Sequence, residues 1–433
     1  MVRSVAPLPK SSGTKPCKSC QNVFARRMEL TLPDGCVSIR CTDPDLITSN
    51  TDADIHTFFD TVRAAPPNAR NALQQVFGLK ADPDGIIGDP WLRSIYKPVD
   101  HNLRDWMHML VSGGCANISC AEILKGLNNH GITLNSISAF IETWTLPHRH
   151  GKVDGQWVSH KRLGKTKESL ASFAGVMLSL MPILACFLEE VIDATHPLYE
   201  QSRCFILLNR IIGILSFGPE HVMIYIAVIR PLIEEWGILF VRIHKPSCVK
   251  PKFHHFFMHI IDDAMRVGKL LSCFVTERKH RQTKRSALFT FRSIDNAVAK
   301  DLLHRQCERF RSDGGALFSR KYIMHPKYVD MRGGRFGHSK IAVLPCGSLY
   351  SNDVLWLSSG RVGKLIRFWS NSTTDTIIAQ VELYSPDDAS DTLWDISSPV
   401  VYFTDTEQII DAVIYGALSD SVIRVIKPAK AGM

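Results

Sequence analysis

The sequence of 433 residues has no aspartate or glutamate before Glu29, and it lacks the short motifs of several large enzyme classes. It contains no Walker A loop for nucleotide phosphates, no G-x-S-x-G nucleophile turn and no H-E-x-x-H zinc-protease motif. It also contains no internal repeat, which argues against a solenoid or a propeller. The function therefore has to be sought in other patterns.

A secretory signal is not expected, because Met1 to Lys18 is rich in proline, serine and lysine and has no apolar core. The 12 cysteines are scattered along the chain. We therefore expect reduced thiols or metal ligands in the cytosol or the nucleus rather than a disulfide framework.

Composition indicates a globular protein of two or three domains. Apolar residues make up 45% of the chain, enough for sizeable cores, and a charged fraction of 21% is ordinary. The net charge of +9 favours an anionic partner.

One segment raises the question of a membrane span, because Leu170 to Leu188 carries no charge and reaches the minimum length. Pro182 interrupts this run, and Glu189 and Glu190 end it. We expect a buried helix of a large α-helical domain, with a membrane span as the weaker alternative.

Periodicity and turn residues divide the chain into a long helical part and a shorter strand-rich part. The expected helices are 52–65, 68–79, 103–111, 121–128, 136–145, 168–191, 201–216, 221–244, 252–267 and 293–310. The expected strands are 341–344, 354–357, 363–369, 376–384, 400–403 and 422–426. The predicted fold class is α+β, a large mostly helical region followed by a small antiparallel β-barrel. The expected parts are a cysteine-containing N-terminal segment at 1–50, a helical domain at 51–310, a basic linker at 311–340 and a β-barrel domain at 341–433.

Cys17 and Cys20 form a C-x2-C turn, a spacing that presents two thiolates to zinc. A structural site needs two more ligands, and Cys36 and Cys41 are the nearest candidates. The alternative is a pair of inert thiols in a turn, and the sequence favours neither. A thioredoxin-like motif is not expected, because no βαβ pattern surrounds the turn.

The stretch from Lys250 to Arg285 has two halves. The first has helical period from Lys252 to Val267, with His255 and His259 four residues apart on one face. In the second, Glu277 is the one acid beside Arg278, Lys279, His280, Arg281, Lys284 and Arg285. Such a carboxylate would stay ionised, and could hold a divalent cation while its neighbours bind phosphates. Spacing alone favours the alternative, a solvated basic helix with one intrahelical ion pair.

Asp105 and His108 form a D-x2-H pattern in the helix expected over 103–111, and Gly113 and Gly114 follow it. By pattern alone this is an amphipathic helix with Asp105 exposed to solvent.

These blocks resemble the C-terminal part of cut-and-paste DDE transposases of the CACTA (En/Spm-like) group, which have an RNase H-like fold. The resemblance rests mainly on K-P-K-F-H-H followed by C-F-V-T-E-R-K-H-R-Q-T-K-R, and it includes the K-P-C-x-x-C-x-N-V turn and D-W-M-H…G-G. It covers roughly Gly13 to Arg285 in scattered blocks. It implies that Glu277 is the third metal-binding acid of a Mg²⁺ or Mn²⁺ site. It implies a supporting role for Asp105 and His108 through a carboxylate–imidazole contact.

The first two catalytic aspartates of that family precede the C-x2-C turn, where this chain has no acid. We therefore expect the C-terminal portion of a transposase, catalytically incomplete as written: a transposase-derived, nuclear, DNA-binding protein. Mg²⁺ or Mn²⁺ is expected only if a full-length site exists, and structural zinc is the other candidate cofactor. The expected DNA-binding residues are Arg278, Lys279, His280, Arg281, Lys284, Arg285, Lys252, His254 and His255. The alternative is a non-enzymatic helical scaffold whose β-barrel binds a protein partner. We expect no small-molecule cofactor and no membrane, and leave a homo-oligomer open.

Overall fold

The structure is a computed structural model, and it describes residues 17–21, 23, 47–148, 153–163, 168–216, 222–244, 248–273, 303–304, 321–331, 334–344, 347–371, 376–387 and 392–426. The chain divides into two compact units. Unit 1 comprises residues 1–119 and 218–272, and unit 2 comprises 120–217 and 273–433. The helical domain expected over 51–310 is therefore divided between two units.

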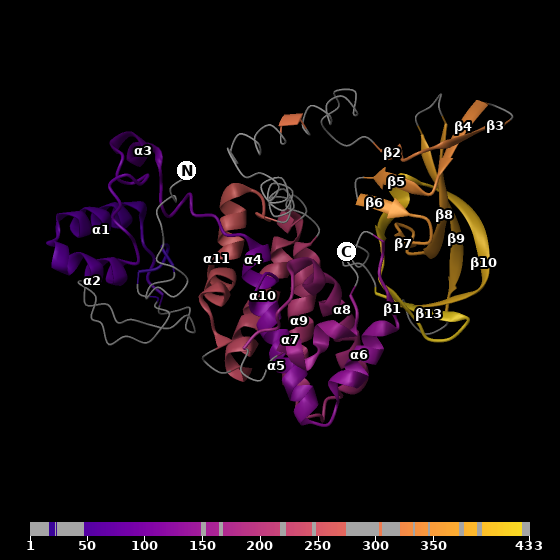
Figure 1. Cartoon of the computed structure of the whole chain (residues 1–433), viewed down its shortest axis with the longest axis horizontal. Coiled ribbons are helices and arrows are strands. Elements are labelled where there is room, and N and C mark those ends of the chain that lie inside the picture. The colour runs from indigo at the N-terminus through magenta and orange to yellow at the C-terminus, as the bar shows by residue number, and fades with distance from the viewer. Residues whose placement is uncertain are drawn as a thin grey trace, which may run out of the picture. The chain divides into compact units, whose positions relative to one another are not determined.

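Unit 1 is built from helices (Figure 1). They are α1 (Asp52–Ala64), α2 (Pro67–Phe77), α3 (Pro90–Ile95), α4 (Trp106–Leu110), the short η3 (Val222–Tyr225), α10 (Ile226–Ile243) and α11 (Pro251–Val267). Helix α5 (Cys115–Asn129) begins in unit 1 and continues into unit 2. Local sequence sets both ends of α11. Pro251 occupies the first turn, where its missing N–H is not needed, and Gly268 ends the helix with a left-handed φ of 72°.

Aromatic packing fixes α11 against α10. The ring of Trp236 on α10 lies 5.4 Å from that of Phe253 and 5.7 Å from that of Phe256 on α11. A Cβ at Gly237 would lie 2.1 Å from the Phe257 ring, so glycine is needed for this close approach. Because these rings are rigid and buried, α11 presents its remaining side chains in a fixed orientation.

The helical part of unit 2 is organised around an apolar helix. Its helices are α6 (Leu134–Glu142), the short η2 (Gly155–Val158), α7 (His160–Leu163), α8 (Ala174–Val191) and α9 (Tyr199–Leu215). Within the described residues, α8 is the helix whose length and composition would suffice to cross a membrane, and half of that window is buried inside the protein. Contacts of α8 with α6 and α9 account for this burial.

The remainder of unit 2 is an antiparallel β structure. Its strands are β1 (Trp144–Thr145), β2 (Tyr322–Ile323), β3 (Lys327–Met331), β4 (Gly334–Ser339), β5 (Ile341–Leu344), β6 (Gly347–Tyr350), β7 (Val354–Leu357), β8 (Val362–Asn371), β9 (Ile377–Pro386), β10 (Leu393–Asp405), β11 (Ile409–Ala412), β12 (Tyr415–Ala417) and β13 (Val422–Val425). The larger sheet has the order β1-β12-β13-β10-β9-β8-β4-β3, with β7 beside β8 and β11 beside β7. The smaller sheet has the order β2-β5-β6. Figure 1 shows β8, β9 and β10 as long strands lying side by side.

These elements confirm the α+β class and the antiparallel sheet, but no closed barrel is found in the part of the chain that the structure describes. The prediction of a linker over 311–340 is wrong for the C-terminal part of that range. There β3 and β4 form a hairpin that pairs Lys327 with His338, and β4 continues onto β8. The segment is rich in Gly, Arg, Lys and His, a composition that does not favour strands. The hairpin forms because β4 pairs with the neighbouring β8, and the local sequence does not show this long-range contact. The helix expected over 293–310 lies outside the described residues except for 303–304.

Candidate metal centre

The C-x2-C turn of unit 1 is buried and held in place by the segment that precedes α1. Cys17 and Cys20 are 1% and 0% exposed, and both thiols are free of disulfide bonds. Cys20 forms a β-bridge with Ser49, and the backbone N–H of Asn50 donates to the Ser19 carbonyl at 3.0 Å. The turn therefore holds both sulfur atoms at fixed positions.

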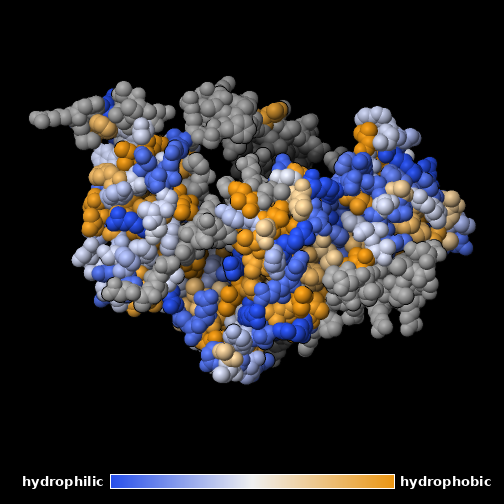
Figure 2. All heavy atoms as spheres, turned by 180° about the vertical axis from the view of Figure 1, so that it is seen from behind, coloured by the Kyte–Doolittle hydropathy of each residue, from blue (hydrophilic) through white to orange (hydrophobic). Residues whose placement is uncertain are grey.

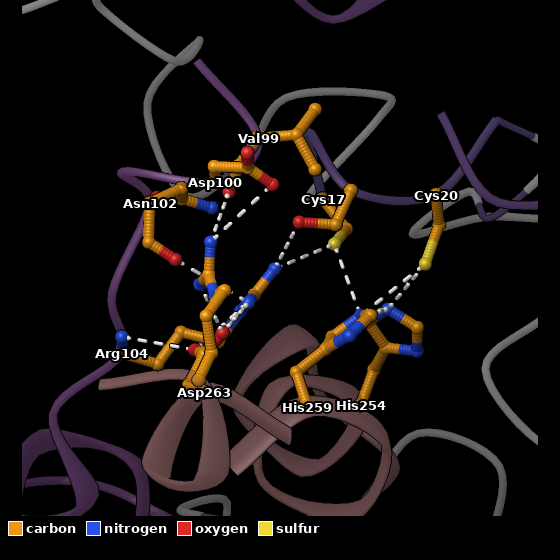
Figure 3. A network of polar contacts seen from close by, with 11 residues as sticks. Cys17, Cys20, Val99, Asp100, Asn102, Arg104, His254, His259 and Asp263 are labelled. Carbon is orange, nitrogen blue, oxygen red and sulfur yellow. Dashed lines mark hydrogen bonds and ion pairs between the residues drawn. The ribbon is translucent and has the colours of Figure 1, made fainter. Parts of the chain in front are cut away.

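Two histidines of α11 face these sulfur atoms (Figure 3). His259 Nε2 lies 3.4 Å from Cys17 Sγ and 3.2 Å from Cys20 Sγ. His254 Nε2 lies 3.4 Å from Cys20 Sγ, and the two imidazole Nε2 atoms are 3.1 Å apart. All four atoms lie within 4.8 Å of one another. Two thiols and two imidazoles from opposite ends of unit 1's sequence thus converge on one point.

The four atoms have nearly the spacing of a tetrahedral zinc shell. With Zn–S near 2.3 Å and Zn–N near 2.0 Å, the tetrahedron has S···N edges of about 3.5 Å and an N···N edge of about 3.3 Å. The observed S···N separations of 3.2–3.4 Å and N···N separation of 3.1 Å are close to these values. The cluster of Cys17, Cys20, His254 and His259 can therefore hold a metal ion such as zinc.

Electrostatics favours the protonation states that a metal requires. Burial opposes ionisation of Cys17, but hydrogen bonds from Cys20 and the nearby histidines outweigh it and hold the pKa of Cys17 well below its ordinary value. Burial lowers the pKa of His254 to about 4. Both shifts are in the direction of the forms that bind zinc, a thiolate and a neutral imidazole.

A buried ion pair joins the turn to α11 (Figure 3). Arg104 Nη1 lies 2.9 Å from Asp263 Oδ2, and its Nη2 donates to Ser19 Oγ at 2.5 Å and to Cys17 Sγ at 3.6 Å. Asp263 also accepts from Arg266 Nη2 at 2.8 Å. Because Asp263 lies one turn after His259, Arg104 supports both the sulfur and the imidazole sides of the site.

Two residues that we expected to contact DNA have other partners. His254 is fully buried in the cluster, so its imidazole has no access to a phosphate. Lys252 Nζ donates to the carbonyl oxygens of Ser112 at 2.7 Å and Gly113 at 3.2 Å. Its ammonium thus binds the backbone that follows α4. His255 lies beside His254, with ring centroids 5.6 Å apart.

The D-x2-H…G-G motif forms a compact turn next to α11. Asp105 is the N-cap of α4 and accepts from the N–H of Met107, while its second oxygen contacts His108 Nδ1. Its side chain is only 14% exposed, which corrects the expectation of a solvent-facing carboxylate. Gly113 has a φ of 61°, and a Cβ at Gly114 would lie 2.0 Å from the Met109 carbonyl oxygen. Both glycines are therefore required by the backbone.

Several expected site residues lie outside the described part of the chain. They are Cys36, Cys41, Glu277, Arg278, Lys279, His280, Arg281, Lys284 and Arg285. Sequence reasoning found the two thiols but missed both imidazole ligands. The available signal was the H-x4-H spacing of His254 and His259 on a helix. Residues five positions apart are rotated by about 140° around the helix axis, so this spacing does not suggest a shared face.

Comparisons with protein-family models, with curated proteins and with solved structures find no match to this chain.

Proposed function

We propose that this chain is a transposase-derived DNA-binding protein in which a structural zinc ion joins the C-x2-C turn to α11. In this function the zinc does not take part in a reaction. It fixes the helix from which the chain continues, within ten residues, to Glu277 and the basic block that follows.

The observation that carries the zinc proposal is the convergence of Cys17, Cys20, His254 and His259 from two distant segments. Four protein ligands fill a tetrahedral shell and leave no position for water or substrate, which is typical of structural zinc. Burial of three of the four side chains points the same way.

Support for the transposase ancestry comes from the way the resembling blocks meet. Cys17 and Cys20 face α11, Lys252 binds the turn after α4, and Asp263 pairs with Arg104. The described parts of three of these blocks, which are scattered in sequence, thus lie together in unit 1. The net charge of +9 and the basic block favour DNA as the partner.

Metal content tests the zinc site directly. We expect the full chain, purified without chelator, to contain one zinc per chain by mass spectrometry of the metal, and Cys20→Ser to lose it. Cys115→Ser is the matched control, because Cys115 is equally buried in unit 1 but burial raises its pKa to about 12, which keeps the thiol protonated. Wild-type protein without zinc, or Cys20→Ser that retains it, would refute the site.

DNA binding is tested by the dependence of affinity on salt. If Arg278, Lys279 and Arg281 neutralise phosphates, changing all three to glutamine lowers the slope of log K against log salt by about 3. The control changes three exposed basic residues of unit 1, Arg63, Lys80 and Lys97, to glutamine. An equal slope in both variants would reject the basic block as the DNA contact and leave the zinc site untouched.

A further inference from the structure

Strand β10 has an edge without a strand partner. Toward β9 it is paired at Trp394 and Asp395 and, after a register shift, from Val400 to Asp405. Toward β13 it is paired from Leu393 to Asp395, and the N–H of Ile396 donates to the Ser421 carbonyl at 2.8 Å. Within the described residues, the side of the backbone that faces away from β9 has no ladder from Val400 to Asp405, and Figure 1 shows β10 as a long strand that extends well beyond β13.

The same stretch exposes apolar side chains on both faces of the sheet. Val400 and Tyr402 are 64% and 44% exposed, although their cross-strand partners Leu383 and Val381 on β9 are buried. On the opposite face, Val401 and Phe403 are 53% and 55% exposed. The hydrophobic core therefore covers the β9 residues but does not extend over their partners on β10. Apolar and polar surface are interspersed on the face that Figure 2 shows, and single exposed apolar side chains are ordinary in proteins. Four in succession on an edge strand are not.

The edge of β10 has few of the features that usually prevent an edge strand from pairing with another chain. Monomeric proteins place charged side chains, especially lysine, on exposed edges or cover them. From Ile396 to Thr404 the sequence has no charged residue, and Pro399 limits pairing only at the start. The nearest charges on the strand are Asp395 and Asp405, at the two ends. The segment from Val400 to Thr404, here called the edge segment, is therefore a template for a further strand.

The composition of the edge segment indicates which strand fits. The segment itself carries no charge, and the charges beside it are Glu382 on β9, opposite Val401, and Arg361, whose guanidinium lies 5.8 Å from the centroid of the Tyr402 ring. An identical uncharged apolar segment is complementary to it on both faces. We propose that the edge segment pairs antiparallel with the edge segment of a second copy of this chain, with Tyr402 on the two-fold axis. This isologous contact continues the sheet of unit 2 across two subunits.

The register about Tyr402 avoids like-charge contacts. Val401 lies opposite Phe403 of the partner subunit, so apolar residues meet on the face away from the core. Asp405 lies opposite Pro399 of the partner subunit, so the flanking carboxylates do not face each other. The inference goes beyond DNA binding and does not depend on the zinc site or on the basic block.

Sedimentation velocity of the full, zinc-loaded chain tests the contact. We expect wild type to dimerise below about 100 µM. The double variant Val401→Lys/Phe403→Lys places lysine opposite lysine twice and should be monomeric over the same range. The double variant Val401→Lys/Phe403→Glu instead places lysine opposite glutamate twice and should recover the dimer. Leu418→Lys is the matched control, since Leu418 is also 55% exposed on unit 2, and it should dimerise as wild type does.

Three results would overturn the proposal. One is a wild-type chain that stays monomeric at about 100 µM, and another is a lysine–lysine variant that still dimerises. The third is a lysine–glutamate variant that remains monomeric while the control dimerises, which excludes the register about Tyr402. Hydrogen exchange distinguishes a monomer whose edge segment is free from a monomer whose edge segment is covered by another part of the same chain. Protection of those amides of residues 400–404 that point away from β9, in a monomeric wild type, would show that another segment of the same chain occupies the edge, and would also overturn the proposal.

Discussion

Replacing Arg104 with methionine tests how strongly the buried ion pair stabilises unit 1. Arg104 and Asp263 have side chains only 7% and 10% exposed, and their charged atoms are 2.9 Å apart. Methionine keeps an unbranched apolar stem but removes the charge and its donors. Asp263 would still accept from Arg266 Nη2 at 2.8 Å and from the backbone N–H of residue 104 at 3.2 Å.

The expected loss in the free energy of unfolding depends on the hydrogen-bond donors that Asp263 keeps after Arg104 is replaced. Removing one partner of a buried ion pair costs about 3–5 kcal/mol in the free energy of unfolding, because the other charge stays buried. Two remaining donors place the expected cost at the lower end, about 3 kcal/mol. For a unit of this size, that lowers the melting temperature by roughly 6–12 °C. Loss of the Arg104 bonds to Ser19 and Cys17 also loosens the turn, so zinc affinity should fall about 10- to 100-fold.

Calorimetry of the zinc-loaded chain measures the first effect, and competition with a chelator of known affinity measures the second. Arg93→Met is the control, because Arg93 pairs with Asp60 at 2.7 Å on the surface of the same unit. An exposed pair contributes at most about 1 kcal/mol. If Arg104→Met lowered the melting temperature no more than Arg93→Met, the buried pair would not be a major support of the site.

Further expectations concern the backbone, the half-buried Lys252 and the pH dependence of stability. Gly114→Ala should cost about 1–3 kcal/mol in thermal unfolding, because its Cβ would meet a carbonyl oxygen at 2.0 Å. Gly175→Ala, with nothing within 4 Å, should be nearly neutral. Lys252→Met should cost about 1 kcal/mol through its lost carbonyl contacts. It should leave the salt slope of DNA binding unchanged, and a reduced slope would restore Lys252 as a DNA contact. In zinc-free protein, burial lowers the pKa of His254 to about 4, so the unfolded chain binds one more proton as pH falls below about 6.5. Stability measured in urea should therefore be full above about pH 6.5 and decrease by about 3 kcal/mol toward pH 4, and a flat profile would contradict this.

Much of the secondary structure was readable from the sequence, because its signals are local. The helix predicted over 252–267 is α11, Pro251–Val267, and the strands predicted at 341–344 and 354–357 have those bounds in the structure. Helical period and the Pro251 and Gly268 punctuation act within a few residues, so they survive folding unchanged. Strands β3 and β4 were missed because the pairing of β3 with β4, and of β4 with β8, compensates for an unfavourable composition.

Only two of the four residues of the candidate metal centre could be predicted from the sequence. The C-x2-C spacing singled out Cys17 and Cys20, which are two of the four residues of the cluster that could hold a metal ion. Proximity in sequence then favoured Cys36 and Cys41 as the others, whereas the described cluster is completed by His254 and His259 on α11. His254 and Lys252 had instead suggested DNA contacts, because a basic pattern does not show which way its side chains point.

Period, capping and short spacings encode local geometry, so most of the helices, several strands and the pair of thiols follow from the sequence alone. Which distant side chains meet depends on the fold: the histidines with the thiols, Arg104 with Asp263, and Lys252 with the turn after α4. The physical reason is that buried charges and thiols must find partners wherever the packing of apolar faces brings them together. That packing joins residues more than two hundred positions apart.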